Sequence, residues 1–81
     1  MSWTFVWHPK AAKYVESLPN ELAKRILKKI DEVSADPFRH IEHFEGSAYK
    51  LRIGDYRALI DIDFEKQILK VRVFDKRERI Y

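Results

Sequence analysis

A tight β-hairpin is predicted where Gly54-Asp55 separates two segments in which side chains alternate in character. A two-residue turn there pairs Ile53 with Tyr56 and places Arg52 directly opposite Arg57. Alternation along the strands sends apolar and basic side chains to opposite faces. The apolar face comprises Tyr49, Leu51, Ile53, Tyr56, Ala58 and Ile60, and the basic face comprises Lys50, Arg52 and Arg57. Because like charges that face each other across a sheet repel, this pattern indicates a surface that binds an anion.

Before the hairpin, the sequence predicts one strand and two helices. Residues 3–7 alternate between aromatic and smaller side chains, as expected of a strand. Trp3, Phe5 and Trp7 are therefore expected to face the core or a partner rather than to form a platform on which nucleic-acid bases stack. A short helix over residues 10–17 turns Ala12 and Val15 inward. A longer helix over residues 19–35 carries four apolar residues at helical spacing: Leu22, Ile26, Ile30 and Val33. Residues 37–48 are expected to be irregular.

After the hairpin turn, a third strand is predicted over residues 56–63 and a fourth over residues 68–74, with Glu65-Lys66 between them. In the two-residue register, Asp61 lies opposite Lys70 and Leu59 lies opposite Arg72. The core-facing residues of the fourth strand are then Leu69, Val71 and Val73. The other face of the sheet is expected to be solvent-exposed and mostly charged.

The order β-α-α-β-β-β predicts an α+β domain that spans residues 1–81. Its two N-terminal helices pack on one face of a small antiparallel sheet, and its first strand lies at an edge or pairs with the last strand. With 46% apolar residues the chain is expected to fold, and without cysteine it has neither disulfides nor thiolate zinc sites. A cytoplasmic location is therefore expected. The sequence has no apolar run of about 18 residues, so no membrane is expected as a partner.

The basic residues are concentrated near the end of the chain. Residues 70–81 contain five cations and two anions, which is the entire net excess of +3. The cations are Lys70, Arg72, Lys76, Arg77 and Arg79. Such a local patch matters more to a polyanion than the overall balance does.

The predicted basic face brings Lys50, Arg52, Arg57 and Arg72 together, and Lys76-Arg77 continues from it. Arginine suits phosphate because its planar fork donates hydrogen bonds in pairs. A solvated face, partly neutralised by acidic neighbours, is the alternative interpretation. RNA carries its own nucleophile, so its cleavage requires positioning, a base, charge stabilisation and an acid. Lys50 is the candidate base, since neighbouring guanidinium groups disfavour its charged form.

The other titratable groups are weaker candidates for chemistry. His8 lies at a strand end, and His40 and His43 fall in the predicted loop. The spacing of His40 and His43 would allow both to bind one metal ion, but the sequence offers no third ligand at a fixed position, so no metal site is predicted. Tyr81 is close to the basic tail, where its ring could stack on a base or its hydroxyl could relay a proton.

The strand–helix–helix–three-strand order, the hairpin over residues 49–57 and the ending over residues 76–81 resemble the RelE/ParE toxin superfamily. The match is closest to its RelE branch, the ribosome-dependent mRNA interferases of type II toxin–antitoxin systems. The resemblance implies a RelE-like fold and a cofactor-free endoribonuclease that cuts mRNA in the ribosomal A site and leaves a 2′,3′-cyclic phosphate. Its implied partners are a RelB-like antitoxin, in a hetero-oligomeric complex, together with the ribosome and mRNA.

The resemblance also implies roles for individual residues. Lys50 and Arg52 would serve general-base chemistry and phosphate contact, and Arg57 would hold the scissile phosphate. Arg77 would stabilise the transition state or assist the leaving group, and Tyr81 would stack on or orient an mRNA base. The implied RNA contacts outside this catalytic set are Arg72, Lys76 and Arg79. Arg52 stands where some relatives have lysine, which leaves Lys50 as the candidate lysine base.

Two other classes of function stay open from the sequence. ParE-like toxins, which act on DNA gyrase, share the fold and generally lack the full catalytic set. A non-catalytic module of the same fold would bind RNA or a partner without cleaving it.

Overall fold

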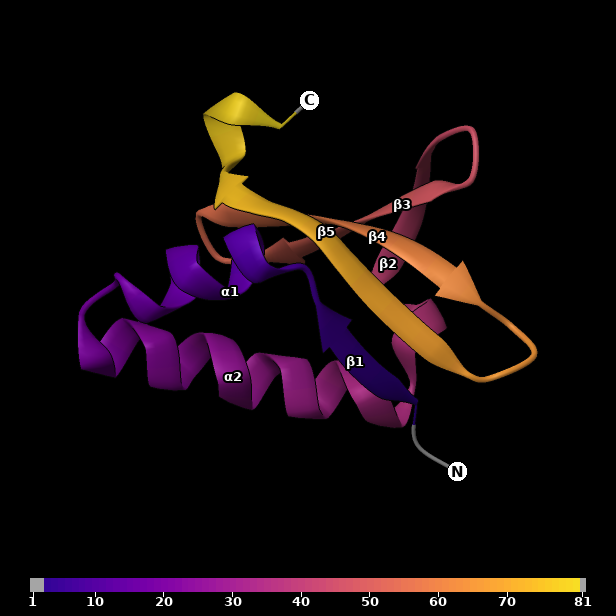
Figure 1. Ribbon diagram of the computed structural model, residues 1–81, viewed down its shortest axis with the longest axis horizontal. Coiled ribbons are helices and arrows are strands. Elements are labelled where there is room, and N and C mark those ends of the chain that lie inside the picture. Colours follow the sequence, from indigo (N-terminus) through magenta and orange to yellow (C-terminus); the bar gives the residue numbers. More distant parts are fainter. Residues whose placement is uncertain (1–2, 81) are drawn as a thin grey trace.

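The computed structural model describes residues 3–80, in which two α-helices pack against one face of a five-stranded sheet (Figure 1). The α+β class predicted from the sequence is confirmed. The elements in chain order are β1 (Thr4–Trp7), α1 (Pro9–Glu16), α2 (Asn20–Ala35), the 3₁₀ turn η1 (Pro37–Arg39), β2 (Ile41–Glu45), β3 (Ala48–Ile53), β4 (Tyr56–Asp63), β5 (Ile68–Lys76) and the 3₁₀ turn η2 (Arg77–Arg79).

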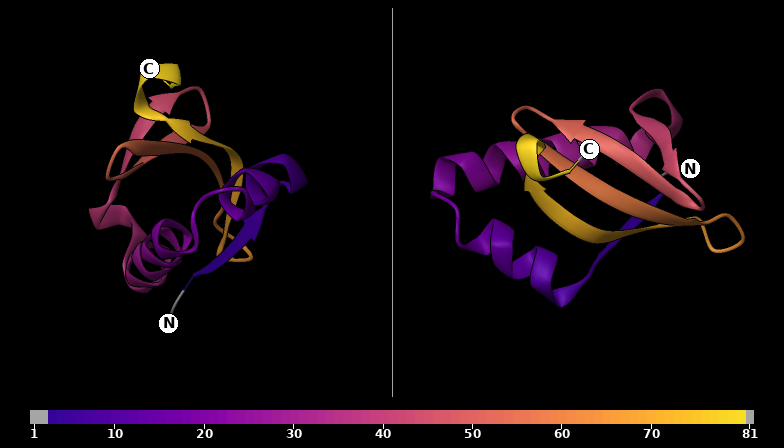
Figure 2. Two further views of the ribbon diagram at one scale, coloured as in Figure 1. Left: turned by 90° about the vertical axis from the view of Figure 1, so that its left-hand side faces the viewer. Right: turned by 90° about the horizontal axis from the view of Figure 1, so that it is seen from above.

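The sheet is mixed, with strand order β1-β5-β4-β3-β2. β1 lies at an edge and pairs with the last strand, as predicted, but it runs parallel to β5. The expectation of a purely antiparallel sheet is therefore wrong. The two helices carry the chain from β1 across one face of the sheet to the opposite edge, where β2 begins (Figure 2).

Residues 37–48 are more ordered than predicted, because η1 and β2 occupy most of this segment. β2 pairs antiparallel with β3, and Glu42 lies directly opposite Lys50. Three of the five residues of β2 are charged or histidine, which an edge strand tolerates because only one of its sides is paired. Alternation is also interrupted, since the register shifts between His43 and Glu45.

A β-bulge in β5 changes the face of the residues that follow it. Asp61 pairs with Lys70 as predicted, but the register then shifts, and Leu59 pairs with Val73 rather than with Arg72. A bulge places two residues of one strand opposite one residue of its partner. Val73 is consequently 41% exposed and the next residue, Phe74, is buried, so the expected core position of Val73 is wrong.

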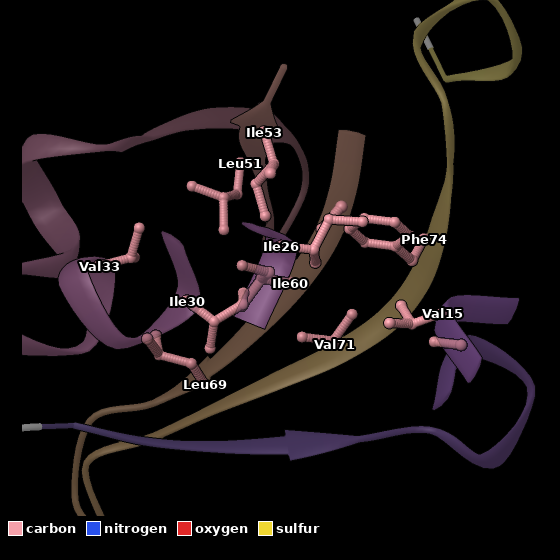
Figure 3. Close-up of a cluster of buried hydrophobic side chains, with 12 residues drawn as sticks. Val15, Ile26, Ile30, Val33, Leu51, Ile53, Ile60, Leu69, Val71 and Phe74 are labelled. Atoms are coloured by element: carbon pink, nitrogen blue, oxygen red, sulfur yellow. The ribbon is translucent and has the colours of Figure 1, made fainter. Parts of the chain in front are cut away.

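The core lies between the helices and the inner face of the sheet (Figure 3). As predicted, α2 contributes Ile26, Ile30 and Val33, while Leu22 is only partly buried. α1 contributes Val15 as expected, but it buries Ala11 rather than Ala12. The strands contribute Leu51, Ile53, Ala58, Ile60, Leu69, Val71 and Phe74, and the three aromatic residues of 3–7 pack against this core. The core fixes the strand that carries Lys50 and Arg52, because Leu51 between them is fully buried.

Candidate functional site

The tip of the β3–β4 hairpin has the predicted arrangement of arginines. Ile53 pairs with Tyr56 and Arg52 pairs with Arg57. Gly54 adopts a φ of +55°, a left-handed conformation that glycine accommodates without a steric penalty. Because side chains alternate along each strand, both arginines lie on the outer face, opposite to the buried Leu51 and Ala58.

The two arginines differ in how they are held. Nη1 of Arg57 donates hydrogen bonds to the carbonyl oxygens of Gly54 at 2.9 Å and Tyr56 at 2.8 Å, which fixes this half-buried guanidinium beside the turn. Arg52 is exposed, and no ion pair involves it within residues 3–80. Arg57 is therefore a preorganised donor, whereas Arg52 is a solvated cation that can adapt to a ligand.

Lys50 has an acidic partner that the sequence did not predict. Its Nζ lies 3.6 Å from Oε1 of Glu42 and 5.4 Å from the centroid of the Phe44 ring. Only 23% of the Lys50 side chain is exposed. The nearest ionic neighbour of the candidate base is thus a carboxylate. Both Glu42 and Phe44 were missed because β2 was not predicted, and the alternation of residues 41–43 was the only signal available.

The rest of the outer face is less charged than expected. Nε of Arg72 lies 2.9 Å from Oδ2 of Asp61, so the bulge leaves Arg72 on this face but neutralised by its neighbour. Next to this pair, Leu59 and Val73 pair across β4 and β5, and Val73 is 41% exposed. The outer face therefore has an apolar centre between an ion pair and the two arginines of the hairpin.

The basic tail, which comprises residues 76–79, is attached to the hairpin turn by a backbone hydrogen bond. The amide of Arg77 donates a hydrogen bond to the carbonyl of Asp55 at 2.9 Å. Beside this bond, a hollow of about 380 Å³ is lined by Leu22, Asp55, Tyr56, Lys76, Arg77 and Glu78. The structure thus brings Arg57 and the backbone of Arg77 to the same turn. Tyr81, the predicted base-stacking residue, lies outside the described residues.

Asp75 stabilises the start of the tail, a role that could not be recognised from the sequence. One of its oxygens accepts a hydrogen bond from the amide of Lys76 at 2.7 Å, and the other lies 3.6 Å from Nη1 of Arg79. Burial, together with the negative charge of Asp75, raises the pKa of Tyr14 on α1. Tyr14 therefore stays protonated and remains a hydrogen-bond donor. Arg79, a predicted RNA contact, is partly neutralised here.

The histidines of residues 37–48 do not form a common site. A ring nitrogen of His43 lies 2.7 Å from the carbonyl oxygen of Gly46, and its ring packs edge-on against Tyr49. His40 instead follows η1 and lies close to Arg39 and Lys50, with which it lines a separate hollow. Among residues 3–80, no three acidic or histidine side chains are close enough to hold a metal ion. In the same part of the chain, no helix is long and apolar enough to span a membrane.

The arrangement suits the binding of a phosphodiester more than that of a small, enclosed substrate. Arg52 and Arg57 offer two guanidinium groups on an open surface, and bidentate hydrogen bonds to phosphate require no deep pocket. Of Lys50, Arg52 and Arg57, only Lys50 can act as a base, because arginine stays protonated.

A protein-family model described as the ParE toxin of the type II toxin–antitoxin system, parDE, matches residues 5–81. The fold is similar to that of the toxin in a RelBE2 toxin–antitoxin complex from Mycobacterium tuberculosis, with a TM-score of 0.83 and 21% identity over 95% of this chain and 100% of that one. It is also similar to an archaeal RelE–RelB complex from Pyrococcus horikoshii, with a TM-score of 0.81 and 24% identity over 98% of this chain and 99% of that one. A free Escherichia coli RelE variant gives a TM-score of 0.78 and 22% identity, over 98% of this chain and 87% of that one. No curated protein matched the sequence.

Proposed function

The chain belongs to the RelE/ParE superfamily of type II toxin–antitoxin toxins, and from this premise we propose that it is a ribosome-dependent mRNA endoribonuclease. The observation that carries the proposal is the pair of arginines that face each other at the hairpin tip, beside Lys50 and next to the Arg77 backbone. A repulsive pair retained on an exposed surface is best explained by an anion that bridges it.

In the proposed reaction, Arg57 holds the scissile phosphate from its fixed position at the turn, and Arg52 closes on it from β3. Lys50 removes the proton of the 2′-hydroxyl, whose oxygen attacks the adjacent phosphorus as the bond to the 5′-oxygen breaks. The leaving 5′-oxygen takes a proton from water, so the products are a 2′,3′-cyclic phosphate and a 5′-hydroxyl. Arg77 neutralises the charge that develops on the phosphate and the leaving oxygen, and Tyr81 orients the mRNA base.

Lys50 can accept a proton only as the neutral amine, so the ammonium group that pairs with Glu42 must first leave that carboxylate and give up a proton to solvent. The ion pair is exposed on its Glu42 side and 3.6 Å long, so its rupture costs little. RNA at the arginines would favour the open form, because its phosphate repels the Glu42 carboxylate. Glu42 thus keeps Lys50 paired until substrate arrives.

The solved RelB–RelE complexes support a cognate antitoxin as the partner of this chain, in a hetero-oligomeric complex. The ribosome and mRNA are proposed partners on the basis of the basic site. We further propose that residues 1–81 act as one domain in the cytoplasm without a cofactor.

Primer extension on mRNA in a translating extract tests the proposal, with the wild type compared with Arg57→Ala and Arg77→Ala. Codon-phased cuts are expected with the wild type, and they should disappear with either variant. Lys50→Ala should lose far more cleavage rate than ribosome affinity. Intact mRNA at toxic doses of wild-type protein would refute the proposal.

The match to the ParE family model favours a second candidate, inhibition of DNA gyrase. A supercoiling assay with purified gyrase, run on the same protein preparation, separates the two candidates. A gyrase inhibitor would block supercoiling and leave mRNA intact.

A further inference from the structure

A basic groove adjoins the candidate site on the side of β2. It has a volume of about 330 Å³ and is lined by Arg39, His40, Ile41, Glu42, Lys50 and Arg52. We call it the η1 groove, because Arg39 lies in η1 and His40 follows it directly. Lys50 and Arg52 border both the groove and the candidate site, so the two are continuous.

The η1 groove contributes one arginine, Arg39, and one histidine, His40, that the proposed reaction does not use. Its other basic residues are Lys50 and Arg52, and its one acidic residue is Glu42. Glu42 is engaged by Lys50 at 3.6 Å. Arg39 is 80% exposed and lies 4.0 Å from Asp36, the limit of an ion pair, so its guanidinium is available to a ligand.

Arg39, at the far side of the groove, and Arg57 lie on opposite sides of β3. Arg57 belongs to β4, whereas the groove begins at β2, two strands away in the sheet. Two strand spacings amount to about 10 Å. An RNA strand that places its scissile phosphate on Arg57 and crosses the sheet toward β2 therefore brings a different phosphate to the groove.

We propose that the η1 groove is a second phosphate subsite, in which Arg39 and His40 bind a phosphate of the same single RNA strand, near the one that is cut. The proposal rests on the proposed function, since it assigns the groove to the substrate of that site. The subsite gives the strand a second point of attachment, which fixes its direction across β4, β3 and β2 and aligns the 2′-hydroxyl for in-line attack.

The test measures binding rather than cleavage, so that it does not depend on the proposed activity. The probes are fluorescent RNA oligonucleotides whose 2′-hydroxyls are all O-methylated so that they cannot be cleaved, one with a single internucleotide phosphate and one with five. Their affinities are measured by anisotropy at several salt concentrations, with wild type, Arg39→Gln and the control Lys28→Gln. Lys28 is an exposed cation on α2, so its variant carries the same change in net charge outside the groove.

Arg39→Gln should weaken binding of the longer probe about threefold to tenfold and lower its logarithmic salt slope by about 0.7, the loss of one phosphate contact to a single strand. Binding of the short probe, and all binding by Lys28→Gln, should stay within about twofold of wild type. Thermal unfolding confirms that each variant is folded.

Equal weakening of both probes, or no change for the longer one, would overturn the subsite. So would an effect seen only with whole ribosomes, which would assign the groove to ribosomal RNA. If wild-type protein leaves mRNA intact in the translating extract, the proposed function fails independently of these affinities.

Discussion

Replacement of Arg52 by threonine is expected to make the free protein more stable while it weakens RNA binding. Arg52 faces Arg57 directly across the hairpin, and no carboxylate pairs with it within residues 3–80. The substitution removes a repulsion from the folded state and places a residue with high strand propensity in an exposed strand position. It also removes one of the two guanidinium groups proposed to hold the phosphate.

The size of the effect follows from the separation of the charges. The side chains of facing residues begin about 5 Å apart at Cβ, and Arg57 bends toward the turn, so a guanidinium separation of about 7 Å is reasonable. Two unit charges at that distance in water repel by about 0.6 kcal/mol. Screening reduces this to about 0.5 kcal/mol at 0.01 M salt, about 0.3 kcal/mol at 0.1 M and almost nothing at 1 M. At 0.01 M the variant should therefore melt about 2–4 °C higher.

Arg72→Thr is the matched control. It makes the same chemical change on an exposed strand, but Arg72 lies 2.9 Å from Asp61 and its loss should destabilise the protein by about 0.2–1 kcal/mol. Thermal unfolding of both variants across the salt series isolates the charge effect from strand propensity. The gain for Arg52→Thr should shrink as salt rises, and so should the loss for Arg72→Thr. A low-salt melting temperature below that of wild type for Arg52→Thr, or a difference that is independent of salt, would refute the reasoning.

Three further outcomes are expected. Glu42→Gln should raise RNA affinity about threefold at low salt, because its carboxylate would lie about 7 Å from a phosphate bound beyond Lys50; unchanged affinity in a filter-binding assay would contradict this. Leu69→Ala removes a fully buried side chain and should cost about 2–5 kcal/mol in urea unfolding, and a cost below about 1 kcal/mol would mean that the core is packed differently. Because folding raises the pKa of Tyr14, its hydroxyl contributes stability that is complete below about pH 10 and is lost as pH rises through the higher native pKa. Tyr14→Phe should therefore flatten the decline of stability above about pH 10, and an equally steep decline in the variant would assign it to other groups.

The hairpin and β4 could be predicted from the sequence because local turn chemistry and alternation agree there. Gly54-Asp55 fixes the register, and the buried alternate residues on both sides leave no second register that keeps the core intact. The pairing of Arg52 with Arg57 followed from this alone.

The partner of Lys50 could not be predicted in the same way. β2 has five residues with an interrupted register and two acids, so its signal is weaker than that of any other strand. The bulge after Lys70 was also invisible, because residues 68–74 read as an uninterrupted alternation. Both features arise from pairing with neighbouring strands, which a single sequence does not contain.

The neighbours of each cation determine where an anion binds this surface first. Lys50, Arg72 and Arg79 each have a carboxylate within 3.6 Å, so a phosphate must compete with that group at every one of them. No carboxylate lies within 4.0 Å of Arg52 or Arg57 in residues 3–80, although Asp75 is the register partner of Arg57 on β5. Because the two arginines also repel each other, we expect a phosphate at the hairpin tip to relieve an unfavourable interaction as it forms a favourable one. We therefore expect the anion affinity of the outer face to be highest at its turn, although cations are spread along its length. We expect Lys50, Arg72 and Arg79 to bind phosphate more weakly than the hairpin tip, because each phosphate contact there replaces an existing ion pair.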